Sequence, residues 1–135
     1  MNLTIHERFG RTCVDTGAMW EPVVGYSRAV RTGPLVSVTG TIGLSPDGSL
    51  PPTAGGQAAR ALEIVLAALR ALGAGPEHVA RTRIYVTDID EWREVGAAHA
   101  AVFGEIRPAT TMVEVSRLAM DGALVEIEAD AYLNG

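Results

Sequence analysis

Two alternating runs near the C-terminus constrain the fold of this chain more than any other feature. In the later run, from Ala123 to Tyr132, small and branched apolar residues alternate with Leu, Glu, Glu, Asp and Tyr. A period of two places the two sets on opposite faces of a β-strand. The run from Thr111 to Arg117 alternates in the same way, and Asp121-Gly122 between the runs is a turn signal. The sequence therefore predicts two strands joined by a turn, with one apolar face and one face that carries carboxylates.

Two helices are predicted upstream, because apolar residues recur there at three- and four-residue spacing. The longer helix covers residues 54–72 and ends at Gly73, a residue typical of helix C-termini. The shorter one begins after Asp88 or Asp90, either of which could cap it, and ends near Gly104. A short helical turn is expected between them, just before a strand.

The remaining elements are predicted to be strands and loops. We expect a first strand at residues 3–9, a loop at 11–25, a hairpin of 26–31 and 35–39, and a strand at 81–87. Together they predict an α+β domain in which two helices pack on one face of a mixed sheet of about six strands. The other sheet face is semi-polar, so a second subunit is expected to cover part of it.

Length and charge narrow the class of protein. A chain of 135 residues, 47% hydrophobic and 20% charged, is expected to form one domain over residues 1–135. A net charge of -5 argues against non-specific binding to nucleic acid or to an anionic membrane. No apolar run approaches the roughly 18 residues of a membrane span, and no signal peptide is evident, so we expect a soluble cytoplasmic protein. The single cysteine, Cys13, excludes an internal disulfide and a Cys-rich metal site.

Several motifs, taken together, resemble the Rid family, also called the YjgF/YER057c/UK114 or L-PSP family. The resemblance covers nearly the whole chain, and its carriers are Gly25-Tyr26, Val38-Thr39-Gly40, the helix that ends in Gly73, residues 79–88, and R-P-A-T-T-M-V-E-V-S-R-L with V-E-I-E-A. It implies a chorismate-mutase-like fold of the bacillus type and a homotrimer whose sheets form a central barrel. It also implies small-molecule clefts between the subunits, and no metal or other cofactor.

The resemblance implies hydrolysis of reactive enamines and imines to a carbonyl compound and ammonia. An iminium carbon is already electrophilic, so such an enzyme needs chiefly to hold its substrate, position water and assist proton transfer. The resemblance assigns Glu126 to the water, and Tyr26, Thr39 and Gly40 to the wall of the cleft. The family's carboxylate-binding arginine falls at Thr110, whose neutral hydroxyl cannot replace a guanidinium as an anion clamp. This departure favours a substrate without the usual carboxylate.

The missing positive charge could come from Arg107, Arg28 or Arg83, and the sequence leaves the three open. Arg107 precedes a proline and is therefore expected in extended backbone with a free side chain. Trp20 and Glu21, in the loop before Tyr26, are either packed cover residues or part of the rim of the cleft.

Other polar residues have plain structural interpretations. Glu114, Glu128 and Asp130 could together bind a hard cation, but a hydrated or salt-bridged face is the favoured interpretation. His99 lies among apolar helix residues, which indicates a core histidine with a local hydrogen bond and no catalytic role. Trp92 is expected to pack in the core or in an interface.

Three functions therefore stay open. The first is a hydrolase for an imine or enamine. The second is a non-catalytic module, binding a small metabolite or regulating another protein, that keeps the cleft but has lost the chemistry. The third is ribonuclease activity, which the acidic charge and the lack of a basic stripe with interleaved aromatics make the least favoured.

Overall fold

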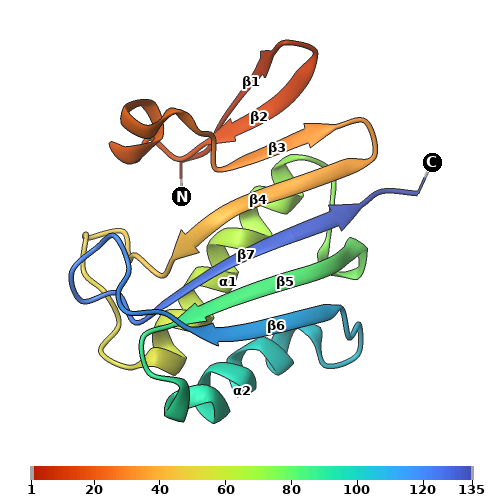
Figure 1. The fold of residues 1–135 in the computed structure, drawn as a ribbon. Coiled ribbons are helices and arrows are strands. Elements are labelled where there is room, and N and C mark those ends of the chain that lie inside the picture. The colour runs from red at the N-terminus through yellow and green to blue at the C-terminus, as the bar shows by residue number, and fades with distance from the viewer. Residues whose placement is uncertain (1, 135) are drawn as a thin grey trace.

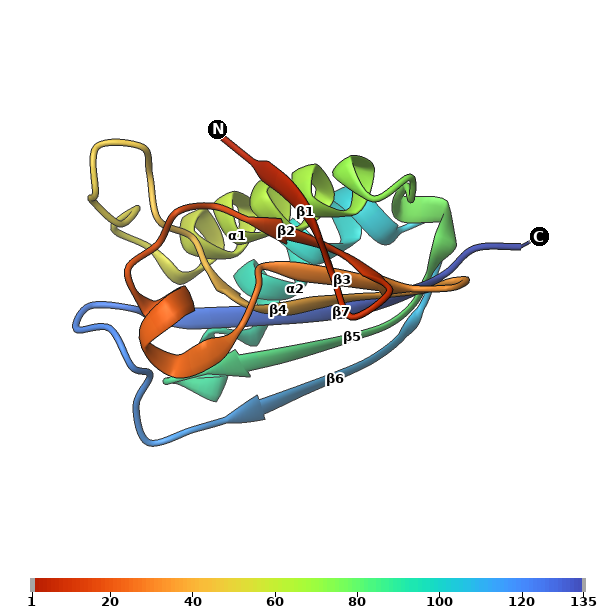
Figure 2. The same ribbon diagram turned by 90° about the horizontal axis from the view of Figure 1, so that it is seen from above.

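A mixed sheet of seven strands carries both helices on one of its faces in the computed structural model, which describes residues 2–134 (Figures 1 and 2). The helices are α1 (Ala54–Ala71) and α2 (Trp92–Phe103). The strands are β1 (Thr4–Arg8), β2 (Arg11–Asp15), β3 (Ala29–Thr32), β4 (Leu35–Ile42), β5 (Val79–Val86), β6 (Ala109–Glu114) and β7 (Val125–Tyr132). Three short helical turns complete the chain: η1 (Glu21–Gly25), η2 (Pro76–His78) and η3 (Ile89–Glu91). The α+β class is confirmed, with one strand more than the approximate count.

The order of strands corrects the predicted C-terminal hairpin. The sheet runs β1-β2-β3-β4-β7-β5-β6, and only β5 and β6 are parallel neighbours. Both strands of the expected hairpin exist, but β5 lies between them (Figure 1). The reason is that α2 connects β5 to β6, and such a strand–helix–strand crossover places its two strands in parallel. The chain then passes the end of the sheet, and β7 inserts antiparallel between β4 and β5.

The N-terminal segment corrects a second expectation. Residues 11–25 were expected to form a loop, yet residues 11–15 form β2, which pairs with both β1 and β3. Phe9 and Gly10 make the connecting turn, with φ of 51° and 76°. Positive φ at both central residues suits the twist of a two-residue hairpin. Five residues are too few for alternation to distinguish this strand from a loop.

Most other local predictions are confirmed. The β3–β4 hairpin closes at Thr32 and Leu35, and α1 begins after Thr53, whose hydroxyl accepts a hydrogen bond from the Gly56 amide at 3.0 Å. The chain leaves α1 through Gly73 with φ of 87°. Of the two proposed capping residues, Asp88 caps η3, which leads directly into α2.

The main core lies between the helices and one sheet face, where apolar positions of both helices meet the central strands. Its large, fully buried side chains include Leu62, Val65, Leu69, Val95, Phe103, Ile84 and Ile127. His99 is half-buried beside the core, and the predicted hydrogen bond is present: its Nε2 lies 2.8 Å from the hydroxyl oxygen of Thr82, and partial burial lowers its pKa. Trp92 is not in the core; it is half-exposed, with the Arg93 guanidinium 4.6 Å from its ring centroid. Within residues 2–134, no helix is long and apolar enough to cross a membrane.

The opposite, open face of the sheet carries a polar network. Arg83 Nη1 lies 3.2 Å from a carboxylate oxygen of Asp130 and 3.9 Å from one of Glu128. Asp130 also accepts from the Ser37 hydroxyl at 3.0 Å, and Glu128 accepts from the Tyr85 hydroxyl. The salt-bridged interpretation is therefore confirmed for Glu128 and Asp130. Among the described residues, no group of three or more His, Cys, Asp or Glu side chains could hold a metal ion.

Candidate functional site

A pocket of about 450 Å³ lies at the end of the sheet where β4 finishes and β7 begins. Its walls come from residues 16–28, from residues 40–46, from α1 and from the connection between β6 and β7. Four of its lining residues bear on the predicted chemistry: Tyr26, Arg28, Gly40 and Glu126. The structure thus brings together three residues that the resemblance assigned to the cleft with Arg28, one of the three candidate arginines.

Glu126 is the carboxylate of this pocket. It is half-buried on β7 and pairs across the strands with Ile42 and Tyr85. Its carboxylate occupies the space that a side chain at Gly40 would need, since a Cβ built there would overlap Glu126 Oε2. Gly40 lies where the register between β4 and β7 shifts, between Val38 and Thr41. A side chain at position 40 would therefore displace the Glu126 carboxylate from its present place.

The electrostatic surroundings of Glu126 favour its neutral form. Burial raises the pKa of Glu126 most, the neighbouring Glu128 carboxylate raises it further, and the positive charge of Arg28 lowers it. A carboxyl group with a raised pKa can take up and release a proton closer to neutral pH than an ordinary glutamate. The arrangement suits a group that exchanges protons with a bound water.

Arg28 is buried beside this carboxylate, and its guanidinium is held by the protein itself. Nη1 donates to the Gly40 carbonyl at 3.0 Å and to the Thr41 hydroxyl at 3.3 Å. Nη2 donates to a Glu21 carboxylate oxygen at 3.5 Å, and the guanidinium carbon lies 5.5 Å from the centroid of the Tyr26 ring. Nε is buried and has no hydrogen-bond partner in the part of the chain that the structure describes. Arg28 therefore supplies positive charge to the pocket, but its two terminal nitrogens are already engaged.

Glu21 and Trp20, which the sequence left undecided, have different places. Glu21 is buried and accepts from the Thr16 hydroxyl at 2.7 Å and from the Thr16 and Gly17 amides at 3.2 Å each. Its carboxylate thus supports the loop from inside and faces Arg28. Trp20 is exposed and lines the pocket of Glu126. Trp20 is therefore part of the pocket rim, and Glu21 is a buried residue that supports the loop.

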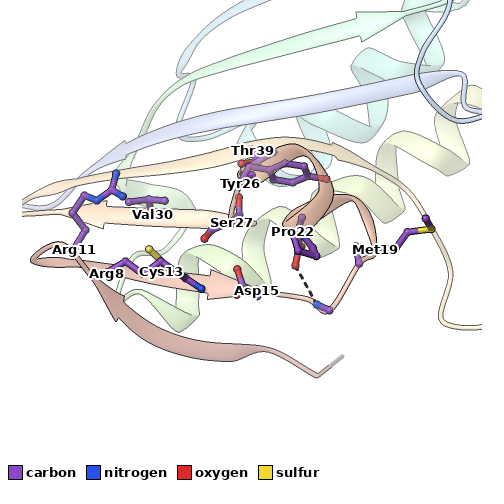
Figure 3. Close-up of a pocket in the computed structure, with 14 residues that line it drawn as sticks. Arg8, Arg11, Cys13, Asp15, Met19, Pro22, Tyr26, Ser27, Val30 and Thr39 are labelled. Carbon is purple, nitrogen blue, oxygen red and sulfur yellow. Dashed lines mark hydrogen bonds between the residues drawn. The ribbon is translucent and has the colours of Figure 1, made fainter.

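A second, larger pocket of about 770 Å³ adjoins the first and contains the predicted cleft residue Thr39 (Figure 3). Tyr26 lines both pockets, and Figure 3 shows Tyr26 and Thr39 next to one another. The Thr39 hydroxyl donates to the Ser27 carbonyl at 2.7 Å. Cys13, a buried free thiol, also lines this pocket. Tyr26 is therefore the shared wall between the Glu126 pocket and the Thr39 pocket.

Thr110 lies away from both pockets, at the start of the edge strand β6. Its hydroxyl oxygen is 2.8 Å from that of Thr82, and it donates to the Pro108 carbonyl at 3.3 Å. Two strands, β5 and β7, separate β6 from β4. Within one protomer, Thr110 and Glu126 are not brought together.

The three candidate arginines also separate. Arg28 alone lines the Glu126 pocket, while Arg83 belongs to the open-face network and Arg107 is exposed. Arg107 is not extended, as its position before a proline predicted, but has φ of 59°. The reason is that its amide donates to the Phe103 carbonyl at 2.8 Å, which reverses the chain at the end of α2.

Sequence reasoning missed the Glu21–Arg28 pair. Both residues lie outside the long periodic segments, and neither burial nor pairing of two charges seven positions apart leaves a pattern in the sequence. It also missed Arg60 of α1, which lines the pocket, donates to the Leu44 carbonyl at 3.0 Å and pairs with Glu63 at 2.9 Å. The nearest available signal was the Trp-Glu-Pro sequence, which marked the loop as unusual.

Comparison with known proteins supports this fold. The family model described as Endoribonuclease L-PSP matches residues 16–133, that is, the chain after β2. A Mycobacterium tuberculosis protein described as a member of the highly conserved YjgF/YER057c/UK114 family is 54% identical. Its structure superposes with a TM-score of 0.85 and covers 91% of this chain and 99% of that one. The predicted chorismate-mutase-like α+β fold is thereby confirmed.

Two curated relatives extend the comparison. A RutC family protein from Pyrococcus abyssi is 32% identical over 118 residues, which cover 83% of this chain and 89% of the relative. The 2-iminobutanoate/2-iminopropanoate deaminase of Escherichia coli is 33% identical over 110 residues, which cover 78% of this chain and 85% of the relative.

Proposed function

Because the chain belongs to the Endoribonuclease L-PSP family, also known as the YjgF/YER057c/UK114 family, we propose that it is a Rid-type hydrolase. The reaction would convert a reactive imine or enamine to a carbonyl compound and ammonia. One observation carries the proposal: the half-buried Glu126 carboxylate lies in a pocket, in the space left by Gly40, with Tyr26 and Arg28 beside it. The deaminase relatives support the same chemistry at the level of the family.

The proposed reaction asks little of the protein beyond positioning. Water adds to the iminium carbon while Glu126 takes a proton from it, which gives a neutral carbinolamine. Glu126 then returns the proton to the nitrogen. As the carbon–nitrogen bond breaks, Glu126 takes up the proton of the hydroxyl group, so the carbonyl compound and ammonia leave, and ammonia then takes this proton from Glu126 as ammonium. A carboxyl group whose pKa is raised by burial suits both the uptake and the return of that proton. A positioned general acid–base of this kind contributes roughly 10²–10⁴-fold in rate.

We propose an imine without a carboxylate as the substrate class. The two arginines that line the Glu126 pocket are already paired, Arg28 with Glu21 and Arg60 with Glu63. A bidentate grip on a substrate carboxylate needs a free guanidinium fork. Trp20, Ile42 and Ile64 give the pocket apolar walls instead. These walls favour a hydrocarbon substituent on the imine.

We also propose that the working unit is a homotrimer whose clefts lie between subunits. The open face carries the Arg83–Glu128–Asp130 network, and the edge strands β1 and β6 each pair with a strand on one side only among the described residues. Sheet edges and semi-polar faces of this kind are commonly covered in oligomers. Thr110 and Arg107 would reach a cleft only if a neighbouring subunit contributes them. Size determination in solution tests this assembly, and a monomer at micromolar concentration would contradict it.

The function is tested by ammonia release from imines generated in situ. An amine oxidase supplies imines without a carboxylate, and an amino-acid oxidase supplies 2-imino acids. We expect the protein to accelerate ammonia release with the first set more than with the second. Glu126→Gln should abolish the acceleration, while Glu105→Gln, an exposed glutamate outside both pockets, should leave it unchanged.

The same panel separates the hydrolase from a binding module. A carbonyl product or imine analogue that raises the melting temperature at saturating concentration binds the native state. If such a compound stabilises the protein but no imine is hydrolysed faster, the protein is a non-catalytic small-metabolite-binding protein and not a hydrolase.

A further inference from the structure

A continuous chain of buried and partly buried contacts joins the loop before η1 to Glu126. Thr16 and Gly17 donate to Glu21, Glu21 accepts from Arg28, and Arg28 donates to the carbonyl of Gly40. Gly40 in turn leaves the space that the Glu126 carboxylate occupies. The Glu21 and Arg28 side chains are only 4% and 9% exposed, so water screens neither charge. The contacts are therefore a fixed part of the pocket rather than a surface ion pair.

We propose that Glu21 and Arg28 form a positioning pair that holds the β4 bulge and the Glu126 carboxylate in their working arrangement. This inference rests on the proposed function, in which Glu126 handles the water. Neither member of the pair need touch the substrate. Arg28 acts through the Gly40 carbonyl and through its charge, and Glu21 acts through Arg28.

Stability alone does not account for the pair. Burying two charges costs several kcal/mol per ion, and apolar residues of similar volume are often as stable or more so. Arg28 Nε adds to this cost, because it is buried and has no hydrogen-bond partner among residues 2–134. Arg28 also meets Glu21 at 3.5 Å, which is long for a strong charge-assisted bond. Because the pair is costly to bury and its contact is long, we infer that it has a role besides stabilising the fold.

The geometry gives the two charges opposite effects on the same carboxylate. Arg28 lowers the pKa of Glu126, whereas burial and Glu128 raise it. Glu21 reduces the positive field of Arg28, because it lies against the same guanidinium. The other charged or titratable groups around Glu126 are Tyr26 after η1, Tyr85 on β5 and Arg60 on α1, which is paired with Glu63. Substitution of either Glu21 or Arg28 should therefore change the electrostatic field at Glu126.

The test uses opposite substitutions in the full-length protein. Arg28→Met removes the positive charge, and the pKa of Glu126 should rise. Glu21→Gln keeps the shape but removes the negative charge, so the pKa of Glu126 should fall. Carboxyl carbon NMR of the side chain reports that pKa directly, with Glu105→Gln as the matched control. Damage to the fold alone would move the two variants in the same direction.

Kinetics gives a second readout on any imine that the wild type hydrolyses. Arg28→Met should shift the acid limb of the kcat profile to higher pH and lower kcat roughly tenfold at the acidic end, with KM nearly unchanged. Glu21→Gln should shift that limb to lower pH. Arg28→Lys keeps the charge without the planar fork, so it should restore the pH profile more than it restores kcat.

The two readouts also keep the inference separate from the proposed function. If the wild type hydrolyses no imine, the proposed function is wrong. The NMR titration still shows whether Glu21 and Arg28 act on Glu126 as proposed. If the pKa of Glu126 shifts in the same direction in both variants, or shifts in neither, the proposed positioning role of the pair is wrong, even if the protein hydrolyses imines. If Arg28→Met does not fold, Glu21→Gln alone decides: a fall in the pKa of Glu126 supports the pair, and no change overturns it.

Discussion

Two groups of charges on this sheet resemble each other in composition but differ in burial. At the pocket, the Glu21 and Arg28 side chains are 4% and 9% exposed. On the open face, the side chains of Arg83, Glu128 and Asp130 are 42%, 31% and 35% exposed. Exposed pairs contribute little to stability because water screens them, whereas a buried charge that loses its partner is costly. The comparison indicates that charges of the same types are shielded from water at the pocket and screened by water on the open face.

The largest expected effect is the loss of the buried cation. Arg28→Ala leaves the Glu21 carboxylate buried without its counter-charge, so the free energy of unfolding should fall by about 3 kcal/mol or more. Chemical denaturation measures this loss. A change below about 1 kcal/mol would mean that the pocket pair behaves like the open-face pairs.

The next effect in size concerns the space beside Glu126. Gly40→Ala places a methyl group against the carboxylate, which should displace Glu126 and cost about 1 kcal/mol of stability, the low end for overpacking because a flexible side chain can move aside. Gly96→Ala is the matched control, because nothing lies within 4 Å of a Cβ there. As a helix-interior glycine on α2, it should gain roughly 0.5–1 kcal/mol. Equal effects of the two substitutions on stability would show that the Glu126 carboxylate does not restrict the residue at position 40.

A smaller effect depends on pH and follows from Glu126. Its pKa is raised in the folded state, chiefly by burial, so the folded state holds this proton more tightly than the unfolded chain does. Stability from this group is therefore present at low pH and is lost as pH rises from the unfolded value near 4.5 through the folded pKa. Glu126→Gln should gain stability relative to the wild type across that window. Thermal unfolding between pH 4 and 8 measures the difference in stability between the two proteins. A difference that stays constant over this range would contradict a raised pKa of Glu126.

The smallest expected effect is on the open face. Arg83→Ala should lower the free energy of unfolding of an isolated protomer by at most about 1 kcal/mol, and added salt should reduce the loss further. Denaturation at low and high salt measures both quantities. A loss as large as that of Arg28→Ala would mean that this face is buried in the assembled protein, which would support the proposed trimer.

Sequence patterns predicted elements well and their neighbours poorly. The apolar spacing of α1 and the alternation of β7 follow from burial on one face, so both were found nearly to the residue. The pairing of β7 was wrong, because the crossover through α2 decides it and alternation does not. In β2, five residues beside a glycine-rich loop were too few to show a period.

The candidate site divides in the same way. Tyr26, Gly40 and Glu126 lie around one pocket, as the family motifs suggested, and these motifs are short and local. The Glu21–Arg28 pair was not predicted, because its members meet only through the folding of a loop against β4. Thr110 and Arg107 stay predictions, since their part in a cleft depends on a second subunit.

The central claim is that Glu126 handles the water in an imine-hydrolysing pocket. The most direct measurement compares single-turnover ammonia release by the wild type and by Glu126→Gln on an imine without a carboxylate, near neutral pH. The account predicts that the substitution lowers the rate at least about 100-fold while the protein stays folded. Equal rates for the two proteins would contradict it.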